Sequence, residues 1–206
     1  MIVISVIFAI LFITSPILRV DKIRTIGLCS VLGVIMLFIL LNKGDILSNA
    51  QSSRFNFFNP CSNYESGGYQ ICNGFIAINS GGILGQGIGK SKQISYIPES
   101  HTDSVFAIIA EQYGLIITTI IFILYATILK KILDISVNST TIRGRYIALG
   151  IASYIFLHIL INLGGLFGIM PLTGIPLPFL SYGGSFTISL ICSLAVVQRI
   201  AIENKS

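Results

Sequence analysis

Long apolar runs alternate with polar or glycine-rich stretches along the chain. Five such runs cover residues 1–18, 25–41, 105–129, 146–167 and roughly 180–198. Each is about as long as the 17–25 residues that an α-helix needs to cross the hydrocarbon core of a bilayer. A helix also satisfies all of its backbone polar groups internally, which lipid requires. The pattern predicts an all-α polytopic membrane protein, a single domain over residues 1–206 with about five transmembrane helices.

Composition and charge agree with this prediction and orient the chain. Charged residues make up 10% of the sequence, whereas a soluble domain carries about 25%. Of the thirteen basic residues, nine fall on one side of the predicted membrane (Arg19, Lys22, Arg24, Lys130, Lys131, Arg143, Arg145, Arg199, Lys205) and four on the other (Lys43, Arg54, Lys90, Lys92). Because basic residues are enriched in cytoplasmic loops, the first side, with the C-terminus, is predicted to be cytoplasmic. The net charge of +5 then reflects topology, and we predict no nucleic-acid binding.

Two connections on the outer side have unusual sequences. Residues 43–104 form a large extracytoplasmic loop, and loops beyond about 15 residues are usually functional or disordered. Within it, the apolar and aromatic segment 69–79 predicts a short amphipathic or re-entrant helix at the membrane interface. The second outer loop, 164–185, is rich in Gly and Pro. The string N-x-G-G-[IL]-[LF]-G starts at Asn79 and again at Asn162, which we interpret as shared helix-breaking chemistry.

The glycine-rich stretch GILGQGIGKSK, residues 82–92, superficially resembles a nucleotide-binding loop. A P-loop needs glycine five positions before Gly89, and the chain has Leu84 there. The GxGxG spacing also departs from the GxGxxG of dinucleotide sites, and no strand–turn–helix context surrounds it. A nucleotide site is therefore excluded, and the glycines are expected to allow tight turns at membrane depth.

Three acidic residues, Glu99, Asp103 and Glu111, cluster where the large loop enters the third apolar run. Ionisable groups near a membrane are costly and are usually functional. Asp103 is expected at the N-terminus of a helix at the outer membrane surface, with Glu111 about two turns deeper on roughly the same face. Two interpretations of Asp103 stay open from the residue pattern alone. It is either a helix N-cap or a functional carboxylate.

Further candidates lie in the same loop: Arg54, Lys90, Lys92, Glu99 and His101. A carboxylate beside cations at a lipid surface suits a substrate that is both a hydroxyl nucleophile and a phosphate ester. Each candidate also has a structural interpretation. His101 would face solvent, the two lysines would attract lipid headgroups, and Glu111 would form hydrogen bonds between helices.

The cysteines and one histidine have mainly structural interpretations. Cys29 and Cys192 lie in predicted spans and are expected to pack as small apolar residues. Cys61 and Cys72 share the outer loop, where a disulfide can form, but we predict that they remain free thiols. Their separation matches no zinc pattern, and no metal site is predicted. His158, alone in an apolar run, is predicted to be a packing residue.

Four sequence blocks follow one another from about residue 54 to residue 185: SRFNFFNP, GGYQICNGFIAINSGGILGQGIGKSKQ, YIPESHTDSVFAIIAEQYGLI and NLGGLFGIMPLTGIPLPFLSYGGS. They resemble signature motifs of the SEDS family (shape, elongation, division and sporulation), which includes FtsW and RodA. The resemblance implies a polytopic enzyme of the bacterial plasma membrane. Such enzymes polymerise lipid II, a lipid-linked disaccharide–pentapeptide, into the glycan strands of peptidoglycan.

The resemblance also implies roles for particular residues. It places the family's essential aspartate at Asp103, which would act as general base on a sugar hydroxyl. Cations, from Lys, Arg or a divalent metal, would offset charge on the departing pyrophosphate. The predicted substrate-binding residues are Arg54, Lys90, Lys92, Glu99, His101, Glu111 and Ser181. The implied partners are a class B penicillin-binding transpeptidase and other membrane proteins of the division or elongation machinery.

Three features depart from the family pattern. The chain has fewer spans, Glu111-Gln112 replaces two consecutive acids, and Ser104 replaces a common aromatic residue. We expect a gene fragment, a misassigned start or half of a split protein. Two other functions stay open, a lipid II flippase or transporter and an inactive scaffold for the transpeptidase. Transporters usually place ionisable residues near the membrane midplane, whereas Asp103 is predicted at the outer surface.

Overall fold

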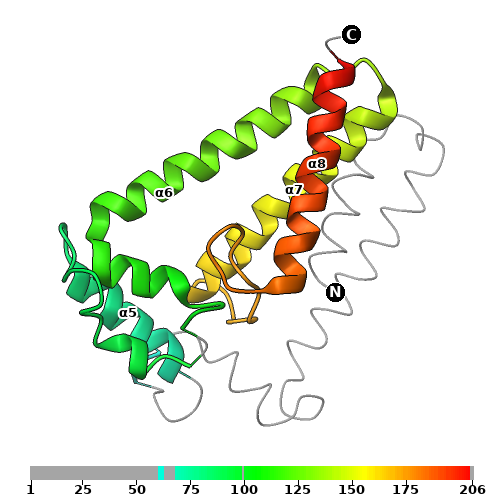
Figure 1. Ribbon diagram of the computed structural model, residues 1–206. Helices are drawn as coiled ribbons and strands as arrows, with labels where there is room; N and C mark the ends of the chain where they lie inside the picture. The colour runs from blue at the N-terminus through cyan, green and yellow to red at the C-terminus, as the bar shows by residue number, and fades with distance from the viewer. Residues whose placement is uncertain (1–59, 63–67, 99, 205–206) are drawn as a thin grey trace, which may run out of the picture.

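The computed structural model describes residues 60–62, 68–98 and 100–204, and the structural statements below concern these residues. They form helices joined by loops: α5 (Tyr69–Gly81), the 3₁₀ helix η4 (Gln93–Ser95), α6 (Val105–Val137), α7 (Ile142–Leu166) and α8 (Gly184–Glu203). The α6–α7 turn and the end of α8 lie at one end of the molecule, with α5 and the long loops at the other (Figure 1). The all-α prediction is confirmed. The runs 1–18 and 25–41 fall outside the described residues.

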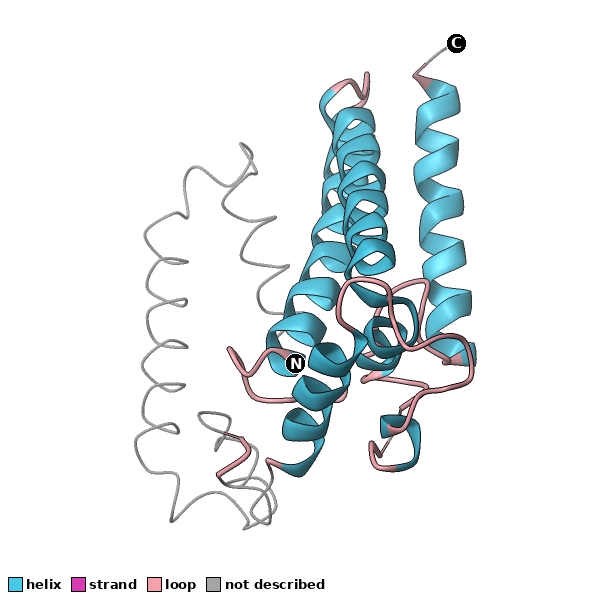
Figure 2. Ribbon diagram, turned by 90° about the vertical axis from the view of Figure 1, so that its left-hand side faces the viewer, coloured by secondary structure: helices cyan, strands magenta, loops and turns pink. Residues whose placement is uncertain are grey.

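Three of the described helices, α6, α7 and α8, are long and apolar enough to cross a membrane. α7 is the central one, since 56% of its apolar stretch is buried, against 17% for both α6 and α8. Figure 2 shows these helices side by side, with the loops gathered below them. The outer helices expose large apolar side chains such as Ile123 and Ile188, and this suits contact with lipid. The last three predicted runs are thus helices that can span a membrane.

The helix α6 is broken at Gly114, whose φ of 74° and ψ of −171° are not helical. The part before the break packs on α5, where Gly81 lies directly against Ala110. The part after it, from Leu115, is the long membrane-crossing segment, and it runs in a different direction (Figure 1). The prediction of one continuous span over 105–129 is therefore wrong in its first third. Glycine adopts this φ without steric cost.

The loop 82–87 satisfies backbone groups that the break leaves free. Four hydrogen bonds from a backbone N–H to a backbone carbonyl join this loop to α6: Gln86 to Glu111 (2.9 Å), Gly87 to Gln112 (3.0 Å), Leu115 to Gly82 (2.9 Å) and Ile116 to Ile83 (3.4 Å). Irregular backbone at membrane depth is tolerated where protein covers it in this way. The glycines that superficially resembled a nucleotide loop thus complete a broken helix.

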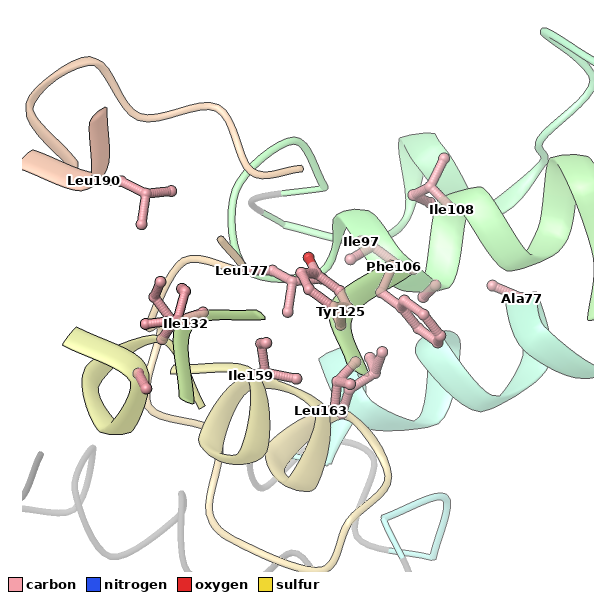
Figure 3. Packing of buried hydrophobic residues seen from close by; sticks show 14 of the residues in the cluster. Ala77, Ile97, Phe106, Ile108, Tyr125, Ile132, Ile159, Leu163, Leu177 and Leu190 are labelled. Atoms are coloured by element: carbon pink, nitrogen blue, oxygen red, sulfur yellow. The ribbon is translucent and has the colours of Figure 1, made fainter. Parts of the chain in front are cut away.

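The buried core joins α5, α6 and α7 to the loop that follows α7. Figure 3 shows Phe106 of α6, Leu163 of α7 and Leu177 of the loop converging in this core. Tyr125 of α6 is buried beside them, and its hydroxyl donates a hydrogen bond to the Pro178 carbonyl. A buried carbonyl needs such a donor. The Gly- and Pro-rich loop is therefore held firmly against the helices.

The structure corrects both cysteine predictions that it covers. Cys61 and Cys72 form a disulfide, with Cα atoms 5.0 Å apart, a usual separation for a bridge. Cys72 is buried on α5, so the bridge ties the start of this helix to the segment before it. Cys192, predicted to pack inside a span, is instead a free and exposed thiol on α8.

The disulfide can be tested by thiol labelling in a Cys29→Ser/Cys192→Ser variant. Because the two remaining thiols are bridged, a maleimide should modify neither before reduction and both after it. Opening the loop by Cys61→Ser/Cys72→Ser should also lower the melting temperature, since a bridge over a short loop contributes about 2–3 kcal/mol. Equal labelling with and without reductant would restore the original prediction of free thiols.

Candidate active site

Asp103 lies in the turn that leads from the loop after η4 into α6, and the loop between α7 and α8 holds this turn. The Ser181 hydroxyl donates a hydrogen bond to the Thr102 carbonyl. The Tyr182 N–H donates to the His101 carbonyl at 2.9 Å. Two loops, about eighty residues apart in sequence, therefore meet beside Asp103, and the cost of closing such a long loop rises only slowly with its length.

Asn162 near the end of α7 fixes the backbone of the same turn. Its side chain is 3% exposed, and its Nδ2 donates to the carbonyls of Asp103 at 2.8 Å and Ile175 at 2.7 Å. Among the described residues, no donor reaches its Oδ1. Because the two donated bonds satisfy buried carbonyls, Asn162 connects the central helix to both loops. The sequence pattern had marked this residue only as the start of a helix-breaking string.

The carboxylate of Asp103 is buried, at 6% exposure, and is oriented by tertiary contacts. Its Oδ1 accepts a hydrogen bond from Gln70 Nε2 at 3.3 Å and lies 3.5 Å from the hydroxyls of Thr102 and Ser104. Gly174 passes beside Oδ2, where a methyl group would lie 3.7 Å away. The N-cap of α6 is Ser104, whose side chain makes no capping hydrogen bond. The interpretation of Asp103 as an N-cap is therefore wrong.

An open pocket of about 550 Å³ lies beside this turn, lined by His101, Val105, Leu180, Ser181 and Tyr182. Its volume is in the range of about 300–1,000 Å³ that ligand pockets occupy. Val105 and Leu180 offer apolar walls, whereas the other three lining residues carry polar groups. Such a lining suits a molecule with both apolar and hydrogen-bonding parts, next to the residue that carries the carboxylate.

Glu111 has a different environment from Asp103. It is 1% exposed, and its carboxylate accepts hydrogen bonds from the Ser91 hydroxyl, from Lys92 N–H at 3.0 Å and from Gln93 N–H at 3.3 Å. These donors belong to the segment that leads into η4. Since a buried carboxylate must be satisfied, Glu111 holds this segment against α6. Its contacts support the structural interpretation. Neither Glu111 nor Asp103 is itself among the lining residues, but Asp103 lies in the same turn as the lining residues His101 and Val105.

The other predicted site residues are distributed unevenly. His101 and Ser181 line the pocket beside Asp103. Lys90 and Lys92 are exposed on the loop that Glu111 holds. Arg54 and Glu99 lie outside the described residues. In the described part of the chain, no three His, Cys, Asp or Glu side chains gather as metal ligands.

Gln70 is a site residue that the sequence reasoning missed. It lies in the first turn of α5, a helix singled out only for its apolar character. A long polar side chain within an apolar helix needs a hydrogen-bonding partner, and that signal could have drawn attention to it. His158, by contrast, packs as predicted, with its ring stacked on Phe186 and beside Tyr154.

This chain is similar in sequence and in fold to known proteins. The sequence profile of the FtsW/RodA/SpoVE family, described as "Cell cycle protein", matches residues 1–206. The chain is 38% identical over 174 residues to "Probable peptidoglycan glycosyltransferase FtsW" of Bacillus subtilis, covering 81% of this chain and 43% of that protein. It is 38% identical over 148 residues to "Peptidoglycan glycosyltransferase MrdB" of Escherichia coli K12, covering 71% and 40%.

A second Bacillus subtilis relative, "Stage V sporulation protein E", is 36% identical over 147 residues, covering 71% of this chain and 40% of that protein. The chain thus spans less than half the length of these relatives. A solved structure described as "Structural coordination of polymerization and crosslinking by a peptidoglycan synthase complex" contains a similar fold. Its TM-score is 0.71 at 20% identity, over 98% of this chain and 55% of that one. The chain therefore belongs to the FtsW/RodA/SpoVE family of bacterial membrane proteins.

Proposed function

We propose that this chain forms the catalytic part of a peptidoglycan glycosyltransferase that polymerises lipid II in the bacterial plasma membrane. The observation that carries the proposal is the buried and oriented carboxylate of Asp103 beside an open pocket. Two relatives with 38% identity are named as peptidoglycan glycosyltransferases. The pocket also combines apolar walls with polar groups, as an amphipathic substrate requires.

The reaction joins two lipid-linked sugars. A sugar hydroxyl of the acceptor attacks the anomeric carbon of the donor, the new glycosidic C–O bond forms, and the bond to undecaprenyl pyrophosphate breaks. Asp103 takes the proton from the attacking hydroxyl as general base. The leaving pyrophosphate carries away the bonding electron pair, and the exposed Lys90 and Lys92 supply positive charge at the same end of the molecule.

We further infer that the Asp103 end faces outward and that the C-terminus is cytoplasmic. Arg143 and Arg145 stand in the first turn of α7, and Arg199 lies near the C-terminal end of α8, before its last turn. Asn204 Oδ1 accepts a hydrogen bond from the Thr140 N–H at 3.1 Å, which brings these two helix ends together. Basic residues at one end support a cytoplasmic placement of that end.

Cysteine labelling tests this orientation. In a Cys29→Ser/Cys192→Ser variant, Lys90→Cys should react with an impermeant maleimide in intact cells, because residue 90 is exposed at the Asp103 end. Asn138→Cys, also exposed but in the α6–α7 turn, should react only after permeabilisation. Labelling of Asn138→Cys in intact cells would reverse the proposed topology and place the pocket on the wrong side for lipid II polymerisation.

Activity itself is tested with fluorescent lipid II. The protein is expressed from its own locus, so that any flanking coding sequence is retained, and is purified with a class B penicillin-binding transpeptidase as the proposed partner. The partner is proposed because the similar solved structure is described as a peptidoglycan synthase complex. We expect glycan ladders on gels when the transpeptidase is present with its own active site inactivated. Movement of lipid II across vesicles without polymer would instead favour a flippase, and neither activity would favour a scaffold.

A further inference from the structure

Gln70 reaches the turn that carries Asp103 from a separate helix. Its Nε2 lies 2.9 Å from Ser104 Oγ, 3.2 Å from the Pro98 carbonyl and 3.3 Å from Asp103 Oδ1. A primary amide has two N–H groups, so three acceptors share two donors. All three contacts cross about thirty residues of sequence. One amide therefore connects the start of α5 to the entry into α6 at three points.

The contact of Gln70 with Oδ1 is shorter than the contacts that Thr102 and Ser104 make with the same oxygen. The hydroxyls of Thr102 and Ser104 are both 3.5 Å from this oxygen, at the limit of a hydrogen bond; such long contacts are weak. Ser104 is itself fully buried, at 0% exposure, and its hydroxyl accepts the best of the three Gln70 bonds. Gln70 thus acts on Oδ1 directly and also through the hydroxyl beside it.

We propose that Gln70 is a positioning residue for the Asp103 carboxylate. This rests on the proposed function, in which Asp103 is the general base. A general base must meet the proton it removes within hydrogen-bond reach, and a misplacement of about 1 Å costs up to about 10²-fold in rate. The hydrogen bond from the Gln70 amide to Oδ1 fixes the rotation of the carboxylate relative to the turn.

The test compares Gln70→Met with a matched control in the full protein, using the fluorescent lipid II assay. Methionine keeps the length and unbranched shape of glutamine but removes the amide. Gln86→Met is the control, because Gln86 is also half-buried and its Nε2 donates to the Ser80 carbonyl at 3.2 Å, away from Asp103. We expect Gln70→Met to lower kcat about 10–100-fold, with KM near that of the parent and Tm lowered by only about 5 °C for the lost hydrogen bonds. Gln86→Met should stay within about threefold of the parent.

A double-variant cycle shows whether Gln70 acts through Asp103. If it does, Asp103→Asn/Gln70→Met should be no slower than Asp103→Asn alone, because residues that act as a unit are non-additive. A further loss in the double variant, or parental kcat in Gln70→Met, would overturn the proposal. If Gln70→Met fails to fold, Gln70→Leu replaces it in every arm, since it removes the amide without placing a second charge beside Asp103.

The proposed function of Asp103 and the positioning role of Gln70 are refuted by different results. If Asp103→Asn retains activity, the proposed function is wrong and the role of Gln70 falls with it. If Asp103→Asn is inactive while both Gln70 variants turn over at the parental rate, only the positioning role is refuted. A fall in Tm that accounts for the loss of activity in both Gln70 variants would assign Gln70 to the folding of α5 instead.

Discussion

Asp103→Asn is expected to lower lipid II polymerisation by about 10²–10⁴-fold, the usual contribution of a general base. Asparagine matches aspartate in size, and its Oδ1 can still accept the hydrogen bond that Gln70 donates at 3.3 Å. The Asn162 bond to the backbone carbonyl at this position is unaffected. The substitution therefore removes basicity and charge while the turn stays in place. The measurement is the initial rate of glycan formation at equal protein level in the membrane.

Asp134→Asn provides the matched control for this variant. Asp134 is an exposed aspartate in the same helix, α6, far from the pocket, and surface substitutions of this kind usually change stability by no more than about 0.5 kcal/mol. Its rate should equal that of the parent. Polymerisation by Asp103→Asn within about threefold of the parent would refute the role of Asp103 as a general base, for which the smallest usual effect is about 10²-fold.

Gly114→Ala is expected to prevent the loop 82–87 from packing against the break in α6. A methyl group at Gly114 would lie 2.5 Å from the Ile83 carbonyl oxygen and closer still to the Gly85 nitrogen. Both atoms belong to the loop that hydrogen-bonds the break in α6, so the loop must move away. The loss of these buried bonds, together with the steric overlap, should destabilise the protein by more than about 4 kcal/mol. Thermal unfolding in detergent and hydrogen exchange over residues 82–87 measure the effect.

Gly89→Ala separates backbone strain from steric overlap. Gly89 has the same φ of +74° as Gly114, but a methyl group there would meet nothing within 4 Å. Its cost should be limited to the left-handed backbone conformation, about 1–2 kcal/mol. An equal fall in melting temperature for the two variants would mean that the contact between loop and helix contributes nothing beyond the φ value.

The parts of the fold that follow from local pattern were predictable. α7 and α8 coincide closely with apolar runs, because one helix supplies all of its own backbone hydrogen bonds. α5 was recognisable from the apolar segment 69–79. The break at Gly114 was not, because the run stays apolar across it and the groups that stabilise it come from residues 82–87. The Cys61–Cys72 bridge was missed for the same reason, since only the folded path of the chain brings the thiols together.

The candidate site was also predictable from the sequence only in part. Asp103 was identified from its position between a polar loop and an apolar run, and from the family motif around it. Its environment depends on Gln70 of α5 and Asn162 of α7, which are 33 and 59 residues away in sequence. Such distant hydrogen bonds leave no periodic signal. The sequence therefore located the carboxylate but could not predict what orients it. For Glu111 it left substrate binding and a structural role open, and the contacts of this residue with the loop support the structural role.

The break in α6 also matches the protein to the thickness of its bilayer. An unbroken helix of 33 residues would be roughly 50 Å long at 1.5 Å per residue, far longer than the hydrocarbon core of about 30 Å. Such a mismatch would have to be relieved by steep tilting or by local thickening of the lipid. The segment from Leu115 to Val137 is roughly 35 Å long, which needs only a modest tilt. Under the proposed function, the sideways turn of α6 before Gly114 places Asp103 level with the lipid headgroups, the depth at which a pyrophosphate linked to a buried polyprenyl chain would lie.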